Sequence, residues 1–180
     1  PSADLLRVEM KGLGPHKYGC LMAVLPDEEL RRRIMDWSLE NIPDFHLAPE
    51  GRETRAHITV KFGFESSSPK SMEKLASLLS QVKPFPISLG QTSLFKGGED
   101  GDVLKVDIMG EVLHQLNHLV STNFACHDKY PDYKPHLTLA YLNPEYSRLY
   151  EGLLFPFTGK EVVFSSLEYT NPEKETIIIP

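Results

Sequence analysis

The sequence predicts an α+β fold in which antiparallel strands are interspersed with a few amphipathic helices. The predicted elements run strand, helix, strand, helix, strand, strand, helix and then three strands. Strands that follow one another directly favour antiparallel pairing over a doubly wound parallel sheet. Each predicted helix also has an apolar face that needs a sheet to cover it. Because no linker or low-complexity segment divides the chain, we expect one domain over residues 1–180.

The first elements follow from apolar periodicity and from Pro and Gly. An apolar run at 18–25 predicts a buried strand, and the acidic residues after Pro26 begin a helix over 27–40. Residues 43–54 are polar and broken by Pro and Gly, which predicts a loop. The alternation of apolar and polar residues over 55–64 then predicts the second strand.

A helix and a hairpin are predicted next. Ser68 before Pro69 is a typical helix start, and the apolar residues that follow at helical spacing end before Pro84. Strand-like segments at 85–95 and 102–108 flank a Gly-rich turn. These two segments therefore predict a β-hairpin.

The last third of the chain predicts one helix and three strands. Apolar residues at helical spacing over 112–120 mark the helix, and a polar loop at 125–135 separates it from a strand at 136–142. Strand-like segments at 161–169 and 176–179 flank an Asn-Pro turn. We expect them to form a closing hairpin.

Composition narrows the possible functions. The chain has 180 residues, of which 41% are hydrophobic, and a net charge of −6. A packed core is therefore expected, whereas the acidic balance argues against double-stranded DNA as a partner. No apolar run reaches the ~20 residues that cross a membrane, so no membrane partner is expected. With only two cysteines and no secretory signal in view, we expect a cytoplasmic location.

One short motif occurs twice, as HITV at 57–60 and as HLTL at 136–139. Strand side chains alternate between faces. One face of each strand is apolar, and the other carries a His, a Thr and nearby cations: Arg55, His57, Thr59 and Lys61 in the first copy, and Lys134, His136 and Thr138 in the second. A single His-x-Thr pattern is common by chance. The alternative interpretation is therefore two half-buried strands with ordinary polar faces, but the duplication on two strands favours a shared site.

Side by side, these strands predict a site for acid–base chemistry at a phosphodiester. An imidazole titrates at ~6.5, so one histidine can accept a proton while the other donates one. The hydroxyls of Thr59 and Thr138 can donate hydrogen bonds to phosphoryl oxygens. The cations Arg55, Lys61 and Lys134 would attract an anionic substrate. No metal or cofactor is needed for this chemistry, and none is expected.

The two motifs, in their contexts HITVKFGF at 57–64 and YKPHLTLAYL at 133–142, resemble the paired His-x-Thr motifs of the 2H phosphoesterase superfamily. That superfamily includes RNA 2′,3′-cyclic phosphodiesterases, also called 2′-5′ RNA ligases, and 2′,5′-oligoadenylate phosphodiesterases. The resemblance implies a bilobal, pseudo-symmetric fold, with antiparallel sheets lining a central cleft and helices outside. It also implies metal-independent catalysis with His57 and His136 as the acid–base pair, and Thr59 and Thr138 as phosphate-binding residues. Which histidine is the base stays open.

The motif contexts are most similar to the phage and prophage branch, which resembles anti-CBASS phosphodiesterases. This similarity implies that the substrate is a cyclic oligonucleotide second messenger, cleaved in the host cytoplasm. A linear RNA or nucleotide with a 2′,3′-cyclic phosphate is the alternative substrate. A non-catalytic nucleotide- or RNA-binding module and a phage structural accessory protein are the alternatives from other classes.

Several further residues have two possible interpretations. Tyr18 can stack on a base, or it can pack in the core at a strand end. The resemblance to the phage branch implies that acidic and aromatic residues near the C-terminal strands contribute to substrate choice, and the candidates are Glu161, Glu168 and Tyr169. His114 and His118 have a spacing that can hold a metal, but they lie largely opposite the apolar stripe of their helix, so we expect a solvated face.

Overall fold

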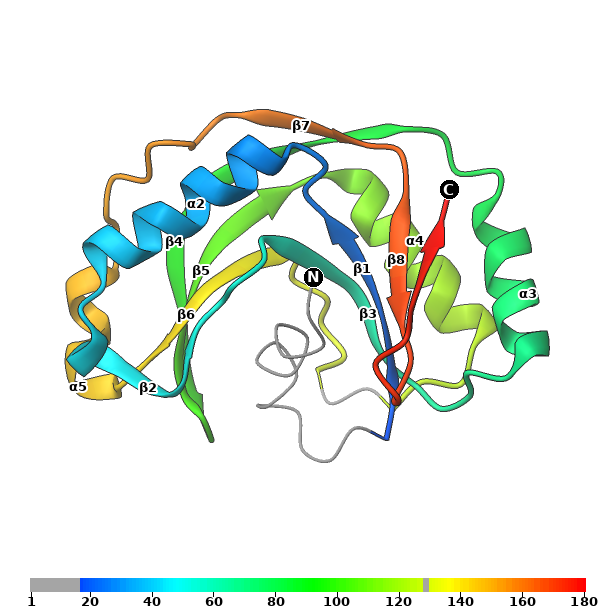
Figure 1. The fold of residues 1–180 in the computed structure, drawn as a ribbon, viewed down its shortest axis with the longest axis horizontal. Helices are drawn as coiled ribbons and strands as arrows, with labels where there is room; N and C mark the ends of the chain where they lie inside the picture. The colour runs from blue at the N-terminus through cyan, green and yellow to red at the C-terminus, as the bar shows by residue number, and fades with distance from the viewer. Residues whose placement is uncertain (1–16, 128–129) are drawn as a thin grey trace.

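The computed structural model describes residues 17–127 and 130–180. Along the described chain, helices lie between single strands and groups of consecutive strands (Figure 1). The elements in chain order are β1 (Gly19–Val24), α2 (Glu28–Asn41), η2 (Asp44–His46), β2 (Leu47–Arg52), β3 (His57–Phe64), α3 (Pro69–Leu79), β4 (Phe85–Gly98), β5 (Gly101–Met109), α4 (Glu111–Asn123), β6 (His136–Leu142), α5 (Pro144–Ser147), η3 (Arg148–Tyr150), β7 (Glu161–Phe164), β8 (Leu167–Thr170) and β9 (Thr176–Ile179).

The strands form one curved sheet. In the described part of the chain it has nine strands in the order β7-β4-β5-β6-β3-β1-β8-β9, and β2 pairs with β6 beside this path. Neighbouring strands pair antiparallel throughout this order. The sheet arches so that one face is concave, and α2, α3 and α4 lie on the outer side of the arch (Figure 1). The predicted α+β class with antiparallel pairing and outer helices is confirmed.

Local sequence explains where α2 and α3 begin. The side chain of Asp27 accepts a hydrogen bond from the backbone N–H of Leu30 and so caps α2. The side chain of Ser68 accepts one from the backbone N–H of Ser71, and Pro69 fits the first turn of α3, where its missing N–H is not needed. The predicted helix starts are therefore close to the observed ones.

The core lies between the helices and the outer face of the sheet. In β3 and β6, Ile58 and Leu137 are fully buried, as are the residues two positions further along, Val60 and Leu139. Apolar residues of α2, α3 and α4 complete this cluster. The side chains between these core positions therefore point to the concave face, which is where both His-x-Thr motifs lie.

Two predictions about elements were wrong. Residues 43–54 are not a loop throughout, since they contain η2 and β2. β2 contains Pro49, which has no N–H to donate, and Gly51 with a positive φ of 75°, and it registers with β6 at only two positions. The predicted strand at 161–169 is also two strands. β7 pairs with β4, whereas β8 pairs with β1 on the other half of the sheet and forms the expected hairpin with β9.

Across the described residues, no helix has both the length and the apolar character that crossing a membrane requires. The N-terminal segment in which we saw no secretory signal lies outside the described residues.

Candidate active site

The two His-x-Thr motifs meet at the centre of the sheet. β3 and β6 are antiparallel neighbours, and Ile58 is registered with Leu137. One residue to either side, this register sets His57 alongside Thr138 and Thr59 alongside His136. All four side chains are half-buried. The predicted convergence of two imidazoles and two hydroxyls on one face is therefore what the backbone geometry provides.

Both imidazole rings are oriented in the same way. Nδ1 of His57 lies 2.8 Å from the carbonyl oxygen of Arg55, and Nδ1 of His136 lies 2.7 Å from that of Lys134. A carbonyl only accepts, so Nδ1 must carry a proton in each ring. In a neutral ring, Nε2 is then the proton acceptor. Each histidine is thus oriented through its Nδ1 by the carbonyl of the residue two positions before it.

The surroundings of His136 favour its neutral form. Its pKa is lowered first by burial, and further by the positive charge of Lys105 and by the neighbouring His57. The hydrogen bond to the carbonyl of Lys134 and the negative charge of Asp107 oppose this and raise the pKa. Because the net effect is a lowered pKa, His136 is largely unprotonated at neutral pH and can accept a proton.

Arg55 is in an ion pair in the structure. Its guanidinium donates two hydrogen bonds, of 2.8 and 2.6 Å, to the carboxylate of Glu168 on β8. The neighbours of Glu168, Leu167 and Tyr169, are buried in the core, so alternation sets Glu168 on the concave face. The predicted anion-binding group of Arg55 is therefore already bound to a carboxylate of the protein.

The other two predicted cations differ in position. Lys61 is only 6% exposed and lies opposite Leu21, past a register shift between β1 and β3, so it leaves the alternation that His57 and Thr59 follow. Lys134 is exposed and lies two residues before the first residue of β6. Of the three predicted cations, only Lys134 offers an exposed charge near the histidines.

Tyr18 belongs to an aromatic group at one end of the site. Its ring stacks on that of His127, with centroids 5.1 Å apart, and makes an edge contact with Phe62. Phe62 packs against Met22 and Val24 of β1. These two residues register with Thr59 and His57 of β3. Tyr18 therefore lies near the concave face, where a base could stack on it, but one side of its ring is already covered by His127.

The C-terminal candidates fall in three different environments. Glu168 pairs with Arg55 as described, whereas Glu161 is exposed on β7, where it registers with Ser88. Tyr169 is fully buried in the core. Only Glu168 lies on the concave face near the motifs.

Sequence reasoning missed a polar cluster beside His136. Lys105 and Asp107 on β5 register with Thr138 and His136, and the ring of Phe95 on β4 makes an edge contact with the ring of His136 at 4.9 Å. The signal was weak, because alternating polar residues on a strand are typical of a solvated face. Only the pairing of β5 with β6 reveals their position.

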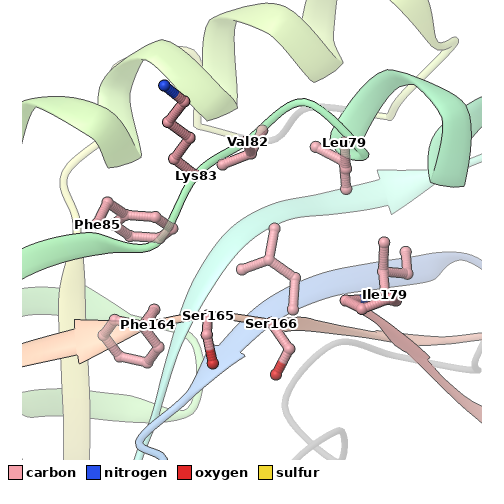
Figure 2. Close-up of a pocket in the computed structure, with 10 residues that line it drawn as sticks. Leu79, Val82, Lys83, Phe85, Phe164, Ser165, Ser166 and Ile179 are labelled. Atoms are coloured by element: carbon pink, nitrogen blue, oxygen red, sulfur yellow. The ribbon is translucent and has the colours of Figure 1, made fainter.

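Two cavities elsewhere in the molecule are not lined by any residue of the two motifs. The crevice in Figure 2 lies between the end of α3, the start of β4 and the β7–β8 connection, and with about 10 Å³ it has room for roughly one water. A groove of about 310 Å³ at the tip of the β4–β5 hairpin is lined by Glu50, Glu99 and Asp100. Neither fits the predicted chemistry, so the concave face remains the candidate site. In the described ranges, no group of three or more His, Cys, Asp or Glu side chains is placed to hold a metal ion.

Comparison with known proteins adds independent findings. Residues 26–163 match the family model of the 2′-5′ RNA ligase superfamily. The fold is similar to that of Kluyveromyces marxianus Usb1, with 13% identity, a TM-score of 0.63, and coverage of 91% of this chain and 98% of that one. It is also similar to E. coli LigT complexed with 3′-AMP, with 18% identity, a TM-score of 0.58, and coverage of 91% and 94%. None of the curated proteins matches the sequence.

Proposed function

The chain belongs to the 2′-5′ RNA ligase superfamily of 2H phosphoesterases, whose members are phosphodiester-processing enzymes, and from this premise we propose a metal-independent phosphodiesterase that uses two-histidine acid–base catalysis. The observation that carries the proposal is the matched pair of rings. His57 and His136 stand on adjacent strands, and each donates its Nδ1 proton to the carbonyl two residues earlier. Because Nδ1 is bound to a backbone carbonyl in both rings, the Nε2 atoms are the ones that suit proton transfer, with one ring accepting a proton and the other donating one.

We assign the base role to His136 and the acid role to His57. The lowered pKa of His136 keeps its Nε2 unprotonated, so this atom can take the proton of an attacking 2′-hydroxyl or water. The attacking oxygen then bonds to phosphorus. The bond to the departing oxygen breaks, and protonated His57 supplies the proton that this oxygen needs.

The hydroxyls of Thr59 and Thr138 have the complementary role. Each lies alongside the histidine of the other strand, so the two pairs flank one centre from opposite sides. A hydroxyl donates one hydrogen bond, and a non-bridging phosphoryl oxygen accepts it. Negative charge on these oxygens is stabilised as the reaction proceeds.

A cyclic oligonucleotide second messenger is the leading substrate in this proposal, and its cleavage would fit a phage anti-CBASS role. Aromatic rings lie on two sides of the histidines. Phe95 contacts His136, and on the other side Phe62 of β3 contacts Tyr18, which directly precedes β1. Bases stack on aromatic rings at about 1–3 kcal/mol each, so two such places suit a substrate with more than one nucleobase.

A linear RNA or nucleotide with a 2′,3′-cyclic phosphate is the second candidate. One observation favours it: two structures with the same fold are complexes with single nucleotides, LigT with 3′-AMP and Usb1 with uridine monophosphate. A site that opens such a ring needs only one base contact, for which Phe95 is placed.

The experiment that separates these substrates is incubation with cyclic di- and trinucleotides and with a 2′,3′-cyclic mononucleotide, followed by mass analysis of the products. We expect cleavage of at least one ring oligonucleotide in the presence of EDTA. A substrate with 2′-deoxy sugar at the scissile linkage stays intact if the 2′-hydroxyl attacks. Strict dependence on an added divalent ion would contradict the metal-independent mechanism.

The same assay tests the rival, a non-catalytic nucleotide-binding module. We expect His57→Ala and His136→Ala each to abolish turnover while nucleotide binding persists, since each acid–base group contributes about 10²–10⁴-fold. Normal activity in either variant would remove the proposed mechanism. Binding without turnover by the unmodified protein, across the whole panel, would favour the binding module.

A further inference from the structure

A buried lysine lies on the strand next to the motif of β6. Lys105 registers with Thr138 and Asp107 registers with His136, while the pair between them, Val106 and Leu137, is fully buried in the core. Alternation therefore sets Lys105 and Asp107 on the concave face, each beside a motif residue. Residues directly opposite on antiparallel strands have Cβ atoms about 5 Å apart.

The ammonium group of Lys105 is held in place from several sides. Its Nζ donates hydrogen bonds to the side chains of Ser93 and Asp107, and it lies 4.3 Å from the centroid of the Phe95 ring. Ser93 in turn donates a 2.7 Å hydrogen bond to Asp107. The Lys105 side chain is 8% exposed, whereas that of Asp107 is 51% exposed. The cation is thus deeper in the sheet than the carboxylate that pairs with it.

A buried ammonium has a large desolvation cost, so its presence needs a compensating role or partner. An ammonium has three N–H donors, and two of them are directed to Ser93 and Asp107. The third N–H is then available to donate to an anion beside Thr138, with which Lys105 is registered. A fixed cation in a poorly solvated position also acts more strongly on a phosphate than an exposed one does.

We propose that Lys105 is a further substrate-binding residue, which contacts a non-bridging phosphoryl oxygen beside Thr138, and that Asp107 is the residue that positions it. The inference deepens the proposed function and rests on it, because it places the reacting phosphate between β3 and β6. It adds Lys105 to Lys134 as a cation beside the motif of β6, whereas both terminal nitrogens of Arg55 are directed to Glu168 on β8.

The first test is anion binding, which needs no turnover. Lys105→Gln removes the charge but keeps a donor for Ser93 and Asp107. We expect it to weaken binding of inorganic phosphate and of 3′-AMP by about tenfold or more, because a hydrogen bond to a charged group is worth at least that much. Lys96→Gln on β4 is the control, since Lys96 is half exposed and pairs with Glu151 instead. Equal binding by Lys105→Gln and the unmodified protein would overturn the inference.

The second test reads the charge at His136 directly. The charged groups that face this ring are Lys105 and Asp107 from β5 and His57 from β3. Titration of the imidazole by NMR in the absence of substrate should give a higher pKa in Lys105→Gln and a lower pKa in Asp107→Asn. Opposite shifts are not expected from a general loosening of the sheet. Shifts in the same direction, or none, would contradict the arrangement.

These readouts also separate the two proposals. If the unmodified protein cleaves none of the substrate panel but Lys105→Gln still loses phosphate affinity, the proposed function fails and the anion site stands. If cleavage occurs and Lys105→Gln matches the unmodified protein in binding and in kcat/KM, Lys105 has no such role. Lys105→Met provides a second variant in case Lys105→Gln does not fold, which far-UV circular dichroism reveals.

Discussion

The ion pair between Arg55 and Glu168 connects the strand that carries His57 to the C-terminal hairpin. It joins the segment just before β3 to β8 through two hydrogen bonds of 2.8 and 2.6 Å. The two side chains are 23% and 14% exposed, so solvent screens their attraction only in part. Charge-assisted bidentate pairs of this kind are stronger than neutral hydrogen bonds. We expect a coupling energy of about 1.5–3 kcal/mol between the two residues.

A double-mutant cycle measures this coupling. Arg55→Ala, Glu168→Ala and the double variant are each unfolded in urea, and the free energies of unfolding are combined. The stability losses of the two single variants should add up to more than the loss of the double variant, because each single variant leaves a partly buried charge without its partner. The matched control is Arg32 and Glu29 on α2, which are also joined by close hydrogen bonds but are 62% exposed on both sides. Their coupling should be much smaller, because an exposed pair is well solvated.

The cycle also decides what Arg55 does. If its guanidinium holds Glu168, Arg55→Ala lowers stability and changes substrate affinity only slightly, while Nδ1 of His57 keeps the backbone carbonyl of residue 55. A coupling energy near zero, together with a large rise in KM, would refute this reasoning. Arg55 would then be the substrate ligand that the sequence alone suggested.

Three more predictions follow from buried or strained positions. Gly63→Ala should cost about 1–3 kcal/mol or more of stability, since its φ is +98° and a Cβ would lie 2.1 Å from the carbonyl oxygen of His127; Gly51→Ala, where φ is +75° and a Cβ meets nothing within 4 Å, should cost less in the same urea assay. Leu137→Ala, at a fully buried position between the two polar residues of its motif, should cost about 2–5 kcal/mol. The lowered pKa of His136 contributes stability above the ordinary value of ~6.5, and this contribution is lost as pH falls, because the unfolded chain then binds a proton that the folded one resists. The urea midpoint should therefore fall less between pH 7.5 and 5.5 in His136→Asn than in the unmodified protein.

The parts of the site that the sequence predicted are those with a local pattern. His57, Thr59, His136 and Thr138 were predicted because the alternation within each strand separates them from their apolar neighbours. The start of α3 was predictable for the same reason, since Ser68 and Pro69 act within one turn. Such features need no knowledge of which strand lies next to which.

The parts that could not be predicted depend on strand neighbours. Lys105 and Asp107 gain their meaning only when β5 pairs with β6, and Arg55 meets Glu168 only because β8 pairs with β1. Lys61 departs from the expected face because a register shift interrupts the alternation of β3. Sequence periodicity contains no information on these pairings, so the positions of Arg55 and Lys61 differ from the expectation, whereas the two histidines share one face as expected.

The site as a whole requires few tertiary conditions. Each imidazole is oriented by a carbonyl of its own strand, at the same spacing of two residues in both copies. The orientation of each ring therefore depends only on its own strand. The register of Ile58 with Leu137 is then enough to bring the two motifs together. A slip of one residue would move one motif to the core face and bury its histidine. The buried pair Ile58 and Leu137 therefore does more than fill the core, because its register aligns the two motifs. In the proposed mechanism, this alignment sets both histidines beside one phosphate.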